Sequence, residues 1–173
     1  MSRTRVLIGG VGYRWMRDAS FGLVASDALA REAWPGGVEV ADLSYGALYA
    51  ALDLADARYD RLVLLGGVAR GREPGRLYRA RWSPRRVSDA ELQARIREAG
   101  AGVVDLDHLL LIAQHFGGLP PDVRCIELEP VHVEGGITLS DAAAARLPEA
   151  LALARAEALA PADAPANETV AAE

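Results

Sequence analysis

The sequence has one cysteine, no lysine and no apolar run of the roughly 18 residues that a membrane-spanning helix requires. Cys125 therefore cannot form an internal disulfide, which fits a reducing environment. The first ten residues lead straight into an apolar run and contain neither the h-region nor the cleavage site of a secretory signal. We therefore expect a cytoplasmic protein without membrane contact. The absence of lysine beside abundant arginine is typical of a coding bias and excludes no function.

The length and the net charge limit the classes of protein that the chain can represent. At 173 residues it is long enough for one domain with a sizeable core, and no internal repeat is visible. A net charge of −5 argues against a protein that binds nucleic acid over its whole surface. The last residues, 160–173, are small, polar and interrupted by proline. We therefore expect a single domain over 1–159, followed by a disordered tail.

Apolar runs that alternate with amphipathic segments predict an α/β domain. The run 61–65 is apolar and is bounded by Asp60 and Gly66, as is typical of a central strand buried on both faces. We predict one three-layer α/β domain, with a twisted, mostly parallel sheet of about five strands and helices on both faces. Strands are expected at 5–10, 38–43, 61–65, 76–82 (at an edge) and 123–128, and helices from Phe21, over 47–54, from Ser88 to Gly100, over 105–116 and from Ser140.

Several residues predict how these helices begin and pack. Ser20 is the expected N-cap of the first helix, and Ser88 with Glu91 forms a capping box. Leu52 is expected to face the core from the second helix. Pro148 predicts a kink or a restart in the last helix.

The loop after the first strand is the first place to look for a site, because ligands of α/β domains bind at the carboxyl ends of the strands. Gly10 and Gly12 match the start of a dinucleotide-binding turn. The third glycine of that turn allows the helix and the strand to pack closely, and Trp15 stands in its place. Asp42, the candidate for the ribose-binding acid, lies too far along the chain. A nucleotide site is therefore disfavoured.

Two other kinds of chemistry have little support. The chain has no G-x-S-x-G motif, and Cys125 lies in the middle of a predicted strand without a neighbouring histidine, which argues against nucleophilic hydrolysis. The three histidines, His108, His115 and His132, include no pair at the i, i+4 spacing of a helical metal site. We favour polar positions on otherwise apolar elements over metal ligands for all three.

Seven arginines fall between Arg70 and Arg86, with Tyr78 and Trp82 among them. Such a pattern can hold phosphate or stack on nucleic-acid bases. It is also typical of a solvated edge strand that arginine protects from pairing with another chain. We favour the second interpretation, because an acidic chain can supply intramolecular partners. Nucleic acid is therefore not an expected partner, and the pattern assigns no role to the cluster.

Short motifs follow one another in a fixed order along residues 5–158. They are 6–12, Asp18, Phe21 with Gly22, the strand 62–65, Pro74 with Gly75, the leucine-rich helix that ends at 117–120, and the segments 126–130 and 136–140. Together these motifs resemble those of the hydrogenase maturation proteases, cytoplasmic endopeptidases that trim a C-terminal extension from the large subunit of nickel–iron hydrogenases. The resemblance implies their α/β fold and a hydrogenase large subunit, or its C-terminal peptide, as partner.

The resemblance also implies where a metal site belongs. Three side chains of the family bind metal and recognise the nickel in the substrate: an acidic residue in the first loop, an aspartate after the central strand and a histidine before the leucine-rich helix. These positions fall on Ala19, Gly66 and Gly102, which have no donor side chains. His108, a weak substitute, lies six residues further on, about 9 Å along a helix. Ligand atoms lie about 2 Å from a metal, so we expect no metal and no cofactor.

The leading hypothesis is a maturation-protease-like protein that retains the fold, has lost the metal-binding triad and acts as a non-catalytic binding or assembly factor. No catalytic residue is assigned. The residues expected to face the substrate are Tyr13, Trp15, Asp18, Asp42 and Gly67. Because several of them are bulky, we expect the first loop to grip a protein surface rather than an ion.

Two alternatives remain open. The first is a working endopeptidase that uses Asp18, Asp42 and His108, although Asp18 can instead cap the first helix and Asp42 can organise the turn at Ser44. The second is an arginine-dependent binding module for nucleic acid or an acidic peptide. A steep salt dependence of binding is the mark of that second class.

Overall fold

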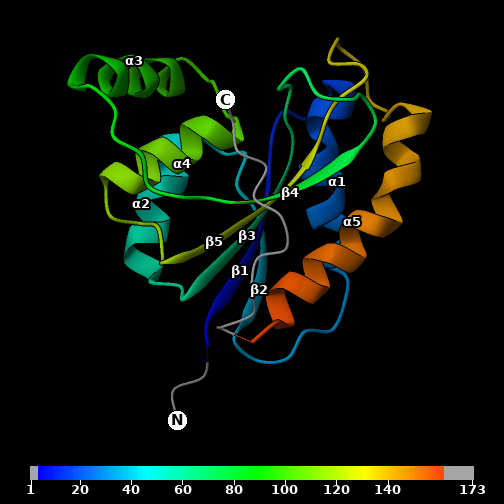
Figure 1. Cartoon of the computed structure of the whole chain (residues 1–173), viewed down its shortest axis with the longest axis horizontal. Coiled ribbons are helices and arrows are strands. Elements are labelled where there is room, and N and C mark those ends of the chain that lie inside the picture. The colour runs from blue at the N-terminus through cyan, green and yellow to red at the C-terminus, as the bar shows by residue number, and fades with distance from the viewer. Residues whose placement is uncertain (1–3, 162–173) are drawn as a thin grey trace.

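The fold is a five-stranded sheet between two layers of helices, as a computed structural model that describes residues 4–161 shows (Figure 1). Most of the predicted tail, residues 162–173, lies outside the described residues. The strand order is β2-β1-β3-β5-β4, and only β4 is antiparallel to its neighbour. The elements are β1 (Val6–Val11), η1 (Arg17–Ser20), α1 (Phe21–Leu29), β2 (Val38–Asp42), α2 (Ala47–Ala57), β3 (Arg61–Gly67), β4 (Leu77–Arg81), α3 (Asp89–Gly100), α4 (Leu106–His115), β5 (Asp122–Leu128) and α5 (Asp141–Leu159).

Helices cover both faces of the sheet, which confirms the predicted three-layer fold. Helices α1 and α5 lie on one face and α2 and α4 on the other, while α3 lies outside α4 (Figure 1). Strand β3 is central and buried, and its side chains alternate between the two cores. Leu62 and Leu64 pack on the side of α2 and α4, whereas Val63 and Leu65 pack on the side of α1 and α5. This alternation is the reason for the uninterrupted apolar run.

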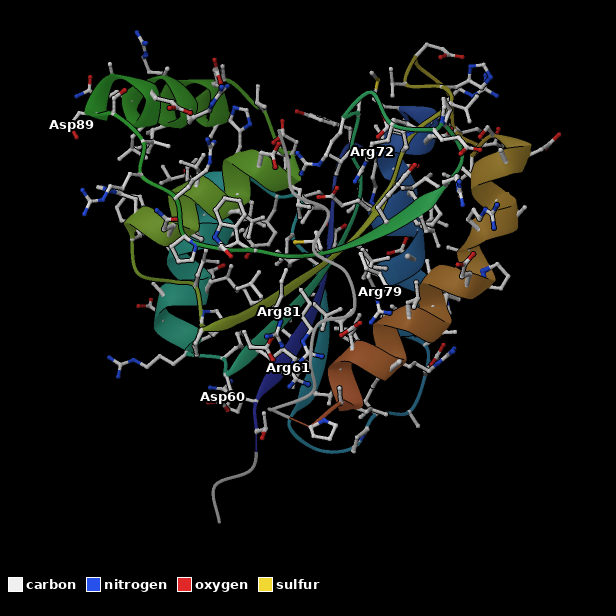
Figure 2. The ribbon with its side chains drawn as sticks, viewed as in Figure 1. Asp60, Arg61, Arg72, Arg79, Arg81 and Asp89 are labelled. Carbon is white, nitrogen blue, oxygen red and sulfur yellow. The ribbon has the colours of Figure 1, made fainter. Side chains whose placement is uncertain are left out.

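Strand β4 forms one edge of the sheet, as predicted, and its arginines contact acidic side chains of neighbouring elements. Arg79 pairs with Glu157 of α5, and Arg81 lies 3.3 Å from Asp122 at the start of β5. Figure 2 labels both arginines and Arg61, which also pairs with Asp122 at 2.6 Å. Charged side chains on an edge strand disfavour pairing with a second chain.

The predicted helix caps were partly right. The Ser88 hydroxyl accepts a hydrogen bond from the Glu91 amide at 3.1 Å, but the Glu91 carboxylate lies near Arg85 instead of completing the capping box. Ser20 stands at the N-cap position of α1, as expected, but its side chain makes no capping hydrogen bond. Its hydroxyl donates to the Arg17 carbonyl at 2.6 Å, because the 3-10 turn η1 precedes α1 and offers that carbonyl.

The expectation that Leu52 faces the core was wrong. Leu52 is 42% exposed, because the buried stripe of α2 consists of Ala47, Ala50, Ala51 and Leu54. Helix α5 does not restart at Pro148 but continues through it. Over the described part of the chain, no helix combines the length and the apolar character that a membrane crossing needs.

Helix α1 approaches the sheet so closely that Gly22 admits no side chain. A Cβ atom there would lie 2.0 Å from the Leu65 carbonyl oxygen and 2.7 Å from that of Val11. We expect Gly22→Ala to lower the free energy of unfolding by at least about 2 kcal/mol in urea denaturation, because α1 must move off the sheet. Gly100→Ala is the matched control, since a Cβ at Gly100 meets nothing within 4 Å. Equal stability of the two variants would contradict this packing.

Candidate functional site

The predicted site residues gather at the carboxyl edge of the parallel strands. Three segments meet there: the loop 12–20 after β1, the loop 68–76 after β3 and the loop 129–140 after β5. Asp42 ends β2 at the same edge and pairs in register with Gly10. The parallel arrangement thus brings these loops together, as the position of the site in α/β folds requires.

The first loop has an unusual backbone. Trp15 and Arg17 have φ values of 62° and 43°, and Arg58 is the one other non-glycine residue with positive φ in the described part of the chain. Such conformations cost about 1 kcal/mol or more each and persist only where surrounding contacts fix them. The first loop is therefore held by its neighbours in a conformation that it does not prefer by itself.

Asp18 provides the main contact that fixes this loop. Its side chain is buried, and its carboxylate accepts hydrogen bonds from the amides of Val131 (2.9 Å), His132 (3.1 Å) and Ser140 (2.7 Å) and from the Ser140 hydroxyl (2.8 Å). Burial by itself raises the pKa of Asp18, but these hydrogen bonds outweigh it, so the pKa lies below the ordinary value. The carboxylate thus faces the β5–α5 loop and not the surface, and it does not cap α1.

Tyr13 joins the first loop to the segment between α3 and α4. Its hydroxyl accepts a hydrogen bond from the Val104 amide at 2.9 Å, and its ring packs against the core on the side of α2 and α4. Burial raises the pKa of Tyr13, the bond from Val104 opposes this, and the nearby charge of Asp105 adds to it. The hydroxyl is therefore already used within the protein.

Asp42 and Arg14 form a second fixed contact at this edge. The Asp42 carboxylate accepts from the Ser44 amide at 2.8 Å, the turn contact considered from the sequence, and from Arg14 at 2.6 Å. Arg14 also binds Asp27 through two hydrogen bonds of 2.8 and 3.0 Å. Burial by itself raises the pKa of Asp42, but the hydrogen bonds from Ser44 and Arg14 outweigh this effect, so the pKa lies below its ordinary value. Trp15, in contrast, is 68% exposed.

Gly67 is a position where two backbones meet. A Cβ atom there would lie 2.1 Å from the Asp18 carbonyl oxygen, so only glycine fits. At Gly66, where the resemblance puts a metal-binding aspartate, the nearest atoms to a Cβ lie at 3.5 Å. A Cβ atom would therefore make only ordinary contacts at Gly66, unlike at Gly67.

The other positions of the expected metal triad offer no donor either. Gly102 has φ of 101°, a conformation that a histidine rarely adopts, and Ala19 uses its carbonyl to bind the Tyr13 amide at 3.2 Å. Between residues 4 and 161, no three histidine, cysteine, aspartate or glutamate side chains are grouped so that they could hold a metal ion. The residues at these positions do not fit a metal.

An ion pair stands beside Gly66 that sequence spacing did not reveal. Glu127 is the register partner of Gly66 on β5, and it is buried, with only 3% of its surface exposed. Arg70 donates two hydrogen bonds of 2.7 Å to Glu127 and also binds Asp107 of α4 at 2.9 Å. These carboxylates raise the pKa of Arg70 above its ordinary value, Glu127 most of all. The positively charged guanidinium of Arg70 thus occupies this part of the edge.

Five other arginines of the cluster are likewise paired within the protein. Arg72 donates to Glu129 at 3.0 Å, lies 2.9 Å from Glu127 and stacks on Tyr78 at 4.0 Å. Figure 2 shows Arg72 at the opposite end of the sheet from Arg61 and Arg81. Further pairs are Arg76–Glu73, Arg79–Glu157, Arg81–Asp122 and Arg85–Glu91. These contacts agree with the interpretation as an edge strand with intramolecular partners.

His108, the weak substitute for a metal ligand, lies between two carboxylates. Its Nδ1 is 2.8 Å from Asp105 and its Nε2 is 2.7 Å from Glu98, which also binds Arg95. The imidazole is buried and connects α3 to α4. Both ring nitrogens are therefore engaged, and neither points freely to the carboxyl edge.

A pocket of about 420 Å³ lies away from all these residues. Leu54, Arg58 and Tyr59 line it from the end of α2, and Phe116 and Pro120 line it from the segment after α4. Helices between parallel strands run back toward the start of the next strand, so their ends lie at the amino edge of the sheet. None of the predicted site residues lines this pocket.

The role of Asp18 can be tested by its pH dependence. Its pKa is lower in the folded protein than in the unfolded chain, so its contribution to stability is present above the ordinary carboxyl pKa and is lost as the pH falls through the folded value. We expect Asp18→Asn to lower the unfolding free energy at pH 7 by about 2–4 kcal/mol, because an amide cannot accept all four hydrogen bonds.

The difference should shrink as the pH falls below about 4, because the carboxyl is protonated first in the unfolded chain and then, at lower pH, in the folded wild type. Urea denaturation between pH 3 and pH 7 measures both effects. Asp56→Asn, at an exposed carboxylate of α2, is the control and should change little. A difference between the wild type and Asp18→Asn that stays constant over this range would contradict the assignment.

Comparison with known proteins identifies a consistent set of similar structures. No protein-family model matches the sequence, and no curated protein does. Among solved structures, the hydrogenase 2 maturation peptidase from Thaumarchaeota archaeon SCGC_AB-539-E09 is 29% identical, with a TM-score of 0.63, over 91% of this chain and 99% of that one.

Two further structures share the fold at lower identity. The hydrogenase maturating endopeptidase HybD from E. coli is 23% identical, with a TM-score of 0.64, over 87% of this chain and 89% of that one. The [NiFe] hydrogenase maturation protease HybD from Thermococcus kodakarensis is 21% identical, with a TM-score of 0.60, over 90% of this chain and 99% of that one. The similarity over nearly the whole domain shows that this chain has the fold of the hydrogenase maturation proteases, and together with the collinear motifs it supports membership of that family as a diverged member.

Proposed function

We propose that this protein acts in the maturation of a nickel–iron hydrogenase by binding the large subunit, or its C-terminal peptide, without nickel-dependent cleavage. The observation that carries the proposal is the chemistry of the expected metal triad. Ala19, Gly66 and Gly102 offer no side-chain donor to a metal. The fold that holds a partner is retained, and the groups that would recognise its metal are replaced.

The neighbouring side chains support this proposal because none of them is placed to substitute. The Asp18 carboxylate is saturated by the β5–α5 loop, and His108 is held between Glu98 and Asp105. The Arg70 guanidinium lies beside Gly66, because it binds Glu127, the register partner of that glycine. Because this guanidinium already binds both oxygens of Glu127, that carboxylate is engaged and does not replace the missing aspartate as a metal ligand.

The two alternatives draw less support from the geometry. An endopeptidase that uses Asp18, Asp42 and His108 would have to free each of them from hydrogen bonds or ion pairs within the protein. An arginine-dependent binding module would have to break the internal pairs of Arg70, Arg72 and the other arginines of the cluster. Each such step leaves a carboxylate or a guanidinium without its partner.

The decisive experiment is co-expression with the large-subunit precursor of the same organism, with and without nickel in the medium. We expect intact-mass spectrometry to find the precursor untrimmed under both conditions, and affinity purification to recover it with this protein. E. coli HybD with its own precursor is the positive control for trimming. Nickel-dependent removal of the extension by this protein would refute the non-catalytic role, and the absence of any complex would refute the binding role.

A further inference from the structure

Two loops at the carboxyl edge hold large apolar side chains in solvent. Trp15 is 68% exposed, Met16 39% and Ile137 81%. Val131 and Val133 of the second loop are 41% and 49% exposed. We call these five residues the apolar platform. Burying such side chains is favourable, so a contiguous exposed set marks a surface that another molecule covers.

The platform is built by contacts between the two loops and not by one flexible segment. Met16 and Gly136 form an isolated parallel bridge. The Gly136 amide donates to the Trp15 carbonyl at 2.9 Å, and the Arg17 amide donates to the Gly136 carbonyl at 3.1 Å. In Figure 1, the loop after β5 projects beyond the ends of α1 and α5. The hydrogen bonds place Trp15 and Met16 next to Ile137.

The backbone of the first loop presents the platform at a cost in stability. Trp15 and Arg17, on either side of Met16, both have positive φ. The free protein gains no burial energy from an indole that is mostly in solvent. A strained backbone that holds an exposed tryptophan in place is typical of a binding surface, where the fixed conformation lowers the entropy lost on association.

The charges around the platform indicate the chemistry of its partner. Arg17 pairs with Glu134 at 3.0 Å, and His132 lies 3.3 Å from the same carboxylate. Arg14 is bound by Asp27 and Asp42. Because these border charges are matched within the protein, the complementary surface is apolar and carries little charge. An acidic or a basic partner would have to break existing pairs.

The position of the platform indicates which molecule carries that surface. Trp15 and Met16 belong to the same loop as Ala19, at the edge where the proposed function puts the hydrogenase peptide. A partner bound there therefore extends over the platform without a second docking site.

We propose that the apolar platform docks an uncharged, apolar segment of the hydrogenase large subunit. This inference rests on the proposed function and adds to it the surface and the kind of contact. Trp15 and Ile137, the two most exposed members, are the anchors. Binding is driven by apolar burial, so it depends little on salt.

The test measures the affinity of the purified large-subunit precursor for the wild type and for Trp15→Ser, Ile137→Ser and the double variant. We expect each single change to weaken binding by at least about tenfold, as truncation of an interface anchor does. Tyr49→Ser is the matched control, since Tyr49 is 67% exposed on α2 and lies outside the platform, and it should leave the affinity unchanged. Between 50 and 500 mM salt, the wild-type affinity should change less than about threefold.

The outcomes separate this inference from the proposed function. If the wild type binds and the platform variants bind equally well, the platform is refuted while the proposed function stands. If binding weakens steeply with salt, an electrostatic surface is responsible and the platform is again refuted. If the wild type does not bind the precursor but sediments as a dimer that Trp15→Ser dissociates, a second copy covers the platform and the proposed function fails too. Unchanged thermal unfolding of the variants excludes misfolding as the cause.

Discussion

The buried carboxylate of Asp18 is the contact on which the carboxyl edge depends. It joins the loop after β1 to the loop after β5 through four hydrogen bonds, and it thereby fixes the strained backbone at Trp15 and Arg17. The same contact places Ser140, which accepts a hydrogen bond from Ala143 and caps α5. Asp18, which the sequence predicted to face a substrate, thus holds two loops of this edge together.

The charges of this edge form a second constraint. Glu127 and Glu129 are buried, and Arg70 and Arg72 neutralise them from the β3–β4 loop. Removing one partner of such a buried pair costs about 3–5 kcal/mol, whereas a complete pair is nearly neutral. The Arg70 side chain therefore fixes the edge beside Gly66. These internal pairs agree with the proposal that the protein does not bind a metal at this place.

The sequence predicted the features that local patterns determine. The apolar run at 61–65 marked the central strand, and the arginine-rich stretch marked the edge, because burial and exposure leave periodic traces in the chain. The contacts of Asp18 could not be predicted, because its partners are distant in the sequence. The donors to Asp18 lie 113 to 122 residues further along the chain, and Arg70 is 57 residues from Glu127. No spacing rule joins residues so far apart.

Calorimetric titration of the isolated protein with nickel, with E. coli HybD measured in parallel, tests the central claim most directly. The claim is that internal contacts have replaced the metal-recognition groups of the family. It predicts no saturable heat of nickel binding for this protein, with HybD titrated in parallel under the same conditions. A stoichiometric site, especially one that His108→Ala abolishes, would contradict it.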